Sequence, residues 1–305
     1  MASSIEVQNV TKRYGSLTAV DDVSFTVQSG ETFGMLGPNG AGKTTTLEMI
    51  EGLRRPTSGR ILVEGIDVAQ RPDEVKAIIG VQLQSSMFFD NLNLVELIET
   101  FASCYDRRVD AMQLLADVQL TEKAGSLAKE LSGGQKQRLS IAIGLVNDPK
   151  VIFLDEPTTG LDPQARHNLW GLVKQIKSRG KTVVLTTHYM EEAEVLCDRI
   201  AIMDHAKIVA LNTTEALLAG TGIDSRIEFS AKTELRDEAF AKLAGVSKLE
   251  RNNGSYCAIS SDSQATLDEL FALGRSGTLQ IQSLSVRRAT LEDVFLKLTG
   301  HQLRE

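Results

Sequence analysis

The N-terminal part of the chain has the alternating pattern of β-strands. Residues 4–10 (SIEVQNV) and 23–30 (VSFTVQSG) alternate apolar with polar side chains, the two-residue period of strands that have one buried face. Residues 32–36 then form a short apolar run that leads into a glycine-rich segment. We expect three strands here, the last of them buried.

Helical spacing then replaces this alternation. From about residue 92 to 146 the apolar positions recur at helical intervals, at Leu92, Val95, Leu97, Ile98, Met112, Leu114, Leu115 and Val118. Apolar strands return at residues 151–156 (VIFLDE) and 182–188 (TVVLTTH), with a helix between them from about 163 to 179. This order predicts an α/β core that is interrupted by a helical insert at about residues 85–148.

The C-terminal part of the chain has a pattern of its own. Residues 226–230 (RIEFS) and 255–260 (SYCAIS) look like strands, and residues 263–274 look like a helix, which predicts a compact α+β unit. No catalytic constellation occurs in it. Because 305 residues are many for a single domain, we expect one large domain and one smaller one.

The glycine-rich segment at residues 37–45 reads GPNGAGKTT and fits the phosphate-loop pattern GxxxxGK[ST]. A buried strand precedes it, and a helix expected at 44–53 follows, with Leu47, Ile50 and Leu53 on one face. The glycines let backbone N–H groups converge on phosphate oxygens. The Lys43 ammonium can reach the β- and γ-phosphates, and the Thr44 hydroxyl can bind Mg²⁺. The expected nucleotide contacts are Gly37, Pro38, Asn39, Gly40, Ala41, Gly42, Lys43, Thr44 and Thr45.

Four further residues are candidates for the same site. Asp155 and Glu156 fall at the C-terminal edge of a buried strand, where parallel sheets bind ligands. We expect Asp155 to hold Mg²⁺ and Glu156 to accept a proton from the water that attacks the γ-phosphate. His188 ends another apolar strand and can donate to a phosphate oxygen, and Tyr14 can stack on adenine. Alone, these residues also fit a solvated strand end, a structural histidine and a surface tyrosine.

A second anion cradle occurs far downstream. Residues 131–138 read LSGGQKQR, a serine and two glycines at the start of a helix, behind the helical insert. The γ-phosphate bound by Lys43 and Thr44 has little room for another cradle from the same subunit. We therefore expect this cradle to receive phosphate from a second copy, so that a head-to-tail pair completes two sites. Hydrolysis would remove the γ-phosphate contacts and let the pair separate.

Composition narrows the class of protein. The chain has 33 basic and 40 acidic residues, a formal charge of −7, which disfavours broad nucleic-acid binding. Three widely separated cysteines lack metal-site or redox spacing and indicate reduced thiols. No apolar run approaches the ~18 residues of a membrane span, and the N-terminus lacks the pattern of a signal peptide. We expect a cytosolic protein whose membrane association comes through a partner.

Together these motifs resemble the ATP-binding cassette (ABC) family over about residues 4–215. The resemblance implies a P-loop NTPase cassette at residues 1–220, which hydrolyses ATP to ADP and phosphate in a two-subunit sandwich, and a small α+β accessory domain at 221–305. Tyr14 matches the adenine-stacking residue and Gln84 the glutamine that holds Mg²⁺ and senses phosphate. Residues matching the contacts at the opposite nucleotide and the dimer interface are Ser132, Gly133, Gly134, Gln135 and Asp162. Two departures are Gly171, which interrupts a helix, and Ala206, where relatives usually have a hairpin glycine.

Three stretches narrow the resemblance to ATPase subunits of ABC-2-type exporters, including the daunorubicin-resistance group: residues 85–105, 187–199 and 291–305. This implies a separate polytopic membrane permease, drug or antibiotic efflux, and a place on the inner face of the cell membrane. Met87, Phe88, Phe89 and Leu92 are candidates for the permease contact, or else pack inside the insert. The alternatives are an importer subunit and a soluble ATPase that acts on nucleic acid. The latter would show a long coiled coil or basic stripes, and neither is found.

Overall fold

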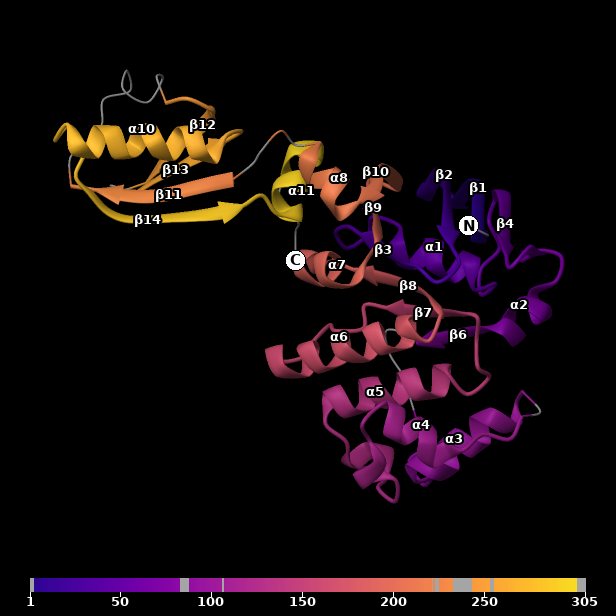
Figure 1. Cartoon of the computed structure of the whole chain (residues 1–305). Helices are drawn as coiled ribbons and strands as arrows, with labels where there is room; N and C mark the ends of the chain where they lie inside the picture. The colour runs from indigo at the N-terminus through magenta and orange to yellow at the C-terminus, as the bar shows by residue number, and fades with distance from the viewer. Residues whose placement is uncertain are drawn as a thin grey trace. The chain divides into compact units, whose positions relative to one another are not determined.

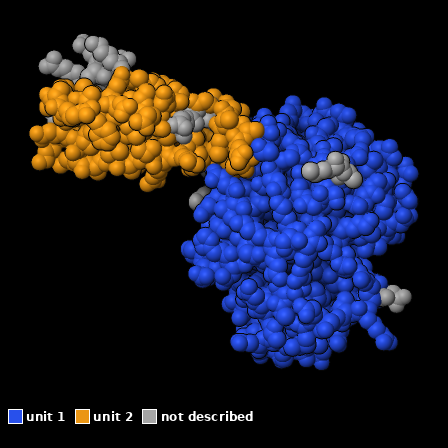
Figure 2. Space-filling model, in the orientation of Figure 1, with its two compact units in different colours: residues 1–213, 303–305 blue, residues 214–302 orange. Residues whose placement is uncertain are grey.

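The computed structural model describes residues 3–82, 88–105, 107–220, 222, 225–232, 243–252 and 255–300. The chain forms two compact units that divide between Thr213 and Thr214 (Figure 2). None of the helices in these described ranges is both long and apolar enough to cross a membrane.

The first unit contains two sheets (Figure 1). Its strands are β1 (Ser3–Tyr14), β2 (Leu17–Gln28), β3 (Thr32–Leu36), β4 (Ser58–Val63), β5 (Ile66–Asp67), β6 (Ile79–Gln82), β7 (Val151–Asp155), β8 (Thr182–Thr187), β9 (Arg199–Asp204) and β10 (Lys207–Thr213). Strands β2, β1, β4 and β5 form an antiparallel sheet in that order. The other sheet has the order β10-β9-β3-β8-β7-β6 and is parallel except for β10.

The helices of this unit surround the parallel sheet and form the insert. They are α1 (Lys43–Ile50), α2 (Pro72–Ile78), α3 (Leu94–Ser103), α4 (Ala111–Asp117), α5 (Gly133–Gly144), α6 (Pro163–Ser178) and α7 (Met190–Leu196), with the short 3-10 turns η1 (Thr121–Lys123) and η2 (Ala128–Glu130). Helices α3, α4 and α5 lie between β6 and β7 in the chain and pack on one another (Figure 1). The helical spacing of residues 92–146 therefore belongs to three separate helices.

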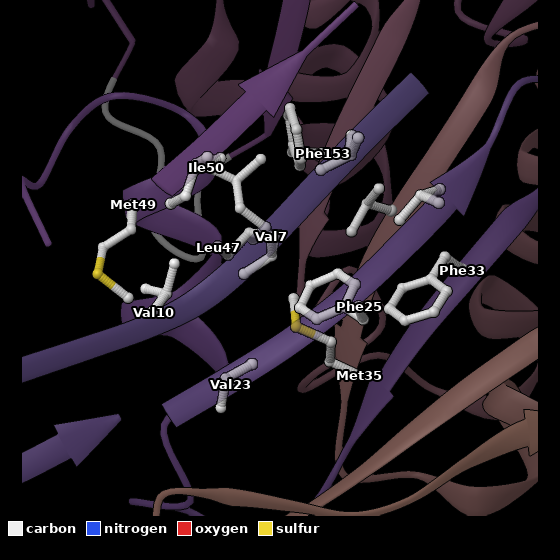
Figure 3. Close-up of a cluster of buried hydrophobic side chains, with 14 of the residues drawn as sticks. Val7, Val10, Val23, Phe25, Phe33, Met35, Leu47, Met49, Ile50 and Phe153 are labelled. Carbon is white, nitrogen blue, oxygen red and sulfur yellow. The ribbon is translucent and has the colours of Figure 1, made fainter. Parts of the chain in front are cut away.

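The main core lies where α1 and the antiparallel sheet meet the parallel sheet (Figure 3). The rings of Phe25 and Phe33 stack with their centroids 5.0 Å apart, joining β2 to β3. From α1, Leu47, Met49 and Ile50 are buried in the same cluster. Burial of apolar surface stabilises a fold by about 25 cal/mol per Å² removed from water. Burial of these three side chains therefore holds in place the helix that follows the phosphate loop.

Local details correct several expectations from the sequence. Helix α1 ends at Ile50, so Leu53 lies beyond it and is 54% exposed. Leu92 precedes α3, and Met112 is exposed on α4. Gly171 does not interrupt α6, which continues through it to Ser178.

The hairpin between β9 and β10 has alanine where glycine was expected. His205 and Ala206 both have left-handed backbone conformations, with φ of 45° and 66°. A side chain is strained in this region, which glycine adopts freely. The Ala206 carbonyl accepts a hydrogen bond from the Asp21 backbone N–H at 2.8 Å, which holds the turn against the antiparallel sheet.

The second unit is a four-stranded antiparallel sheet with one long helix on it (Figure 1). Its elements are α8 (Thr214–Ala219), β11 (Ser225–Ala231), β12 (Val246–Asn252), β13 (Ser255–Ser260), α10 (Ser263–Arg275), β14 (Ile281–Arg288) and α11 (Leu291–Thr299). Phe229 and Tyr256 of the sheet share a core with Leu270 of α10. The predicted strands and helix are present. Strands β12 and β14 were not predicted, because polar and charged residues interrupt their apolar pattern.

A close backbone approach joins the insert to the parallel sheet. A Cβ atom on Gly80 of β6 would lie 1.9 Å from the carbonyl oxygen of Gly144, at the end of α5. The Asn147 side chain supports the same junction, because its Nδ2 donates to the carbonyls of Ala77 and Ile79. Only glycine at position 80 lets α5 pack this near to β6.

We therefore expect Gly80→Ala to destabilise the first unit by about 1–3 kcal/mol through overpacking. Gly171→Ala is the matched control, because a Cβ there meets nothing within 4 Å. In an exposed helix interior that change should stabilise by up to about 1 kcal/mol. Urea unfolding followed by the fluorescence of the single tryptophan, Trp170, measures the first unit specifically. Equal stabilities for the two variants would contradict the close approach.

Candidate active site

The order of the parallel strands brings distant parts of the sequence together. Strand β8 lies between β3 and β7, with Leu36 paired with Thr187 and Asp155 with Thr186. All three strands run in the same direction, so their carboxyl ends lie at one edge of the sheet. The phosphate loop, the carboxylates after β7 and His188 leave the sheet there, as expected for a ligand-binding edge.

Two glycines of the phosphate loop are required by their surroundings. A Cβ on Gly37 would lie 2.3 Å from the Met203 carbonyl oxygen, and one on Gly42 would lie 2.5 Å from that of Ala19. Gly42 also has a φ of 102°, in the region that favours glycine, immediately before α1. These positions let the loop turn sharply from β3 into the N-terminus of α1, where free backbone N–H groups can face an anion.

Lys43 is buried at the first turn of α1, 4% exposed. Its ammonium donates hydrogen bonds to the carbonyls of Gly37 and Pro38 at 2.7 and 3.1 Å. It also lies 3.6 Å from Oε1 of Glu156. Burial lowers the pKa of Lys43, and the nearby Glu156 and Asp155 carboxylates oppose that effect. The lysine is thus held inside the loop, with partners that a phosphate could replace.

Asp155 is held by two hydroxyl groups. Thr44 of the phosphate loop donates to its Oδ1 at 3.2 Å, and Thr186 of β8 donates to the same oxygen. Burial raises the pKa of Asp155, and these two hydrogen bonds partly counteract it. A hydroxyl and a carboxylate oxygen, both of the hard type that Mg²⁺ prefers, therefore lie side by side.

Glu156 adopts an unusual backbone conformation, with φ of 46°. Its N–H points at Thr186, 3.2 Å from the carbonyl oxygen and 3.0 Å from the hydroxyl. Its Oε2 accepts from the Thr159 hydroxyl at 3.2 Å and lies 3.4 Å from His188 Nδ1. The strained left-handed backbone therefore occurs at the residue whose carboxylate lies beside Lys43 and His188.

Two helices are capped by Ser132 of the second cradle and by Asp162, which lies after β7. Ser132 is the N-cap of α5 and forms a capping box with Gln135, and Asp162 is the N-cap of α6. A Cβ on Gly134 would lie 3.1 Å from the Ala165 Cβ atom. The cradle therefore packs against the start of α6, while Ser132, Gly133 and Asp162 remain exposed.

Of the two residues expected at the adenine and at Mg²⁺, Tyr14 is among the described residues and Gln84 is not. Tyr14 is 41% exposed, its hydroxyl accepts from Arg54 at 3.2 Å, and Lys12 lies 5.0 Å from its ring centroid. An exposed ring beside cations fits a base-stacking role, which stays a prediction. Gln84 and Met87 lie outside the described residues.

Two residues near Asp155, Thr186 and Glu51, were not predicted from the sequence. Thr186 holds both Asp155 and Glu156, but threonine in an apolar strand has no distinctive signal. Glu51, at the C-terminal end of α1, is 2% exposed. Burial, together with Asp155 and Glu48, raises its pKa to about 8. The sequence could not show that this position is buried near another carboxylate.

Comparisons with known proteins agree with this geometry. The family described as "ABC transporter" matches residues 20–159. The chain is 41% identical over 314 residues to the Nod factor export ATP-binding protein I of Burkholderia lata, covering 99% of this chain and 98% of that protein. The corresponding protein of Paraburkholderia xenovorans is also 41% identical over 314 residues, 99% of each chain. This chain belongs to the ABC transporter family.

Solved structures of the family share the fold. An ATP-binding subunit of an ABC transporter aligns with a TM-score of 0.64 and 29% identity, over 72% of this chain and 93% of that one. A dimeric bacterial ABC transporter cassette aligns with a TM-score of 0.62 and 29% identity, over 68% and 98%. A structure of that cassette after hydrolysis holds ADP and phosphate. The predicted P-loop cassette fold is confirmed, and the family binds ATP.

The buried Glu51 makes stability depend on pH. Its folded-state pKa of about 8 lies above the ordinary 4.5, so the folded chain keeps a proton that the unfolded chain releases. Stability from this group is therefore lost as pH rises from about 4.5 to about 8. We expect Glu51→Gln, which stays neutral, to gain about 1 kcal/mol or more over the wild type by pH 8.

Thermal melting of the wild type and Glu51→Gln at a mildly acidic and a mildly alkaline pH measures this effect. Glu99→Gln on the exposed face of α3 is the control and should melt like the wild type at both values. A difference between Glu51→Gln and the wild type that does not grow with pH would contradict it.

Proposed function

We propose that this chain is the ATPase subunit of an ABC-2-type exporter, which hydrolyses ATP between two of its copies and powers export through a separate polytopic permease. The observation that carries the proposal is the Glu156 carboxylate. It is held within 3.6 Å of the phosphate-loop lysine and 3.4 Å of His188. A base, a cation and a hydrogen-bond donor then surround the place where a γ-phosphate would lie.

Bound nucleotide would rearrange this set of contacts. The Lys43 ammonium would exchange the carbonyls of Gly37 and Pro38, and its pairing with Glu156, for β- and γ-phosphate oxygens. Glu156 would then be available to take a proton from the attacking water, while the His188 imidazole donates to the γ-phosphate. Pairing with Lys43 thus offsets the charge of the buried carboxylate until substrate arrives.

The residues present fit a magnesium ion. The Thr44 hydroxyl and the Asp155 carboxylate, already within 3.2 Å of each other, would be its protein ligands. When bound, Mg²⁺ would offset phosphate charge. Gln84 is proposed as a third ligand from the sequence alone.

The second cradle supports action as a pair. Ser132, Gly133 and Gly134 begin a twelve-residue helix whose N-terminus suits an anion, and the first two are exposed. We propose that they, with Gln135 and the Asp162 loop, meet the nucleotide bound by a second copy. The dimeric relative gives a precedent for a two-copy assembly.

Export and the permease rest on other observations. The full-length relatives are named for Nod factor export, which supports export as the direction of transport. At the start of the insert, Phe89 is 58% exposed and lies against Phe101, 6.3 Å between ring centroids. We propose this aromatic pair as part of the permease contact, which would hold the chain at the inner face of the membrane. Drug or antibiotic efflux rests on the resemblance in sequence alone.

Glu156→Gln should bind ATP, lose hydrolysis by at least about a hundredfold and accumulate as an ATP-dependent dimer, because the base is removed while binding contacts remain. Light scattering with saturating Mg-ATP measures the mass. Lys43→Ala is the control and should lose both binding and turnover. Only monomer in the presence of bound ATP, or retained hydrolysis, would count against the proposal.

The permease is tested by isolating tagged Glu156→Gln with Mg-ATP from detergent-solubilised host membranes, then identifying its companions by mass spectrometry. We expect a polytopic protein in near-equal amount, and less of it with Phe89→Ser in the same background, at unchanged ATP binding. Phe271→Ser, at an exposed phenylalanine of the second unit, is the control. Recovery of the tagged chain only from the soluble fraction, alone or with nucleic-acid-binding proteins, would contradict the proposed role in transport.

A further inference from the structure

A fully buried carboxylate lies just behind the candidate active site. Glu192 on α7 is 0% exposed, and its Oε1 accepts a hydrogen bond from Trp170 Nε1 of α6 at 3.2 Å. Helix α7 packs against α6, β8 and β3. A buried charge is costly without partners, and an apolar residue would fill this space at less cost. Its surroundings therefore need an explanation beyond packing.

The other neighbours of Glu192 come from two loops of the site. Burial raises the pKa of this carboxyl, and the nearby Thr187 and Thr158 hydroxyls and the Trp170 N–H lower it in part. Thr187 immediately precedes His188, and its hydroxyl also accepts the Tyr189 N–H at 2.9 Å. Thr158 is fully buried two residues after Glu156. One carboxylate thus adjoins both loops that carry the candidate base and the candidate histidine.

The third element is α6, whose N-cap is Asp162. Arg166 on this helix attracts the Glu192 carboxylate, and its guanidinium lies 4.5 Å from the ring centroid of Tyr189. Trp170, one turn further along, donates the indole hydrogen bond. Helix α6 is therefore connected to the loop after β8 both through Glu192 and through the stacked arginine.

We propose that Glu192 is a positioning residue for ATP hydrolysis, which joins the loop after β7, the loop after β8 and helix α6 so that Glu156 and His188 keep their relative placement. This inference rests on the proposed function. It assigns Glu192 no contact with nucleotide. Because small misplacement of catalytic groups costs about a hundredfold in rate, loss of this connection should lower turnover more than binding.

The test compares Glu192→Gln and Glu192→Ala with Glu31→Gln. Glu31 is another buried carboxylate of the first unit, 8% exposed, which accepts the Gln28 N–H at 2.7 Å and pairs with Arg199. It precedes β3, at the opposite end of the parallel strands from the site. It therefore controls for loss of a buried charge without loss of the proposed connection.

We expect Glu192→Ala to lower kcat for ATP at least about tenfold with KM changed less than about threefold, and Glu192→Gln to retain more activity because its amide oxygen can still accept from Trp170. Glu31→Gln should melt at a temperature no higher than that of the Glu192 variants, but should keep the kcat of the wild type. An unchanged kcat in folded Glu192 variants, a loss confined to KM, or a fall in kcat for Glu31→Gln of the same size would overturn the proposal.

A spectroscopic readout separates positioning from stability. Trp170 is the only tryptophan in the chain, so its emission reports on the Glu192 contact directly. In the wild type, ATP binding should change this emission, and the change should be lost in Glu192→Ala but kept in Glu31→Gln. An equal change in all three proteins would contradict the connection. If the wild type hydrolyses ATP and Glu156→Gln does not, the proposed function stands whatever the Glu192 variants show.

Discussion

The parallel pairing of β3, β8 and β7 is the constraint on which the rest of the structure depends. Strand β8 lies between strands that are more than a hundred residues apart in sequence, and the register sets Leu36 beside Thr187 and Asp155 beside Thr186. Because side chains alternate across a strand, a one-residue slip would turn the Asp155 carboxylate to the other face. The close contacts of Thr44, Asp155, Glu156 and His188 follow from this register.

Burial of charge is the second theme of the site. Lys43, Asp155 and Glu156 are all nearly inaccessible to solvent, and each is held by neutral hydroxyls or carbonyls as well as by opposite charge. Such an arrangement stabilises charges that would otherwise be costly to bury. It also leaves the lysine with partners that a polyphosphate can displace, so the same contacts serve the free chain and fit the binding of nucleotide.

Side-chain contacts also link the residues around the candidate site to helices α5, α6 and α7. The hydroxyl of Thr186 accepts the Glu156 N–H at the start of the loop after β7, and the buried Glu192 carboxylate lies near Thr158 of the same loop. The second cradle packs on the start of α6 through Gly134 and Ala165. Helix α6 therefore contacts both the second cradle and the buried Glu192 within one copy.

Sequence alone predicted the candidate site residues and their order along the chain. The phosphate loop, the carboxylates after an apolar strand, the second cradle and His188 were all found there, because glycine requirements and the periods of helix and strand are local properties. The tertiary structure decided where a helix ends and which charged residues are buried, because these depend on contacts between distant segments. Leu53 fits a helical face in sequence, yet the helix ends before it. Glu51 and Glu192 look like ordinary surface acids, and only packing between segments far apart in the chain buries them and selects their partners.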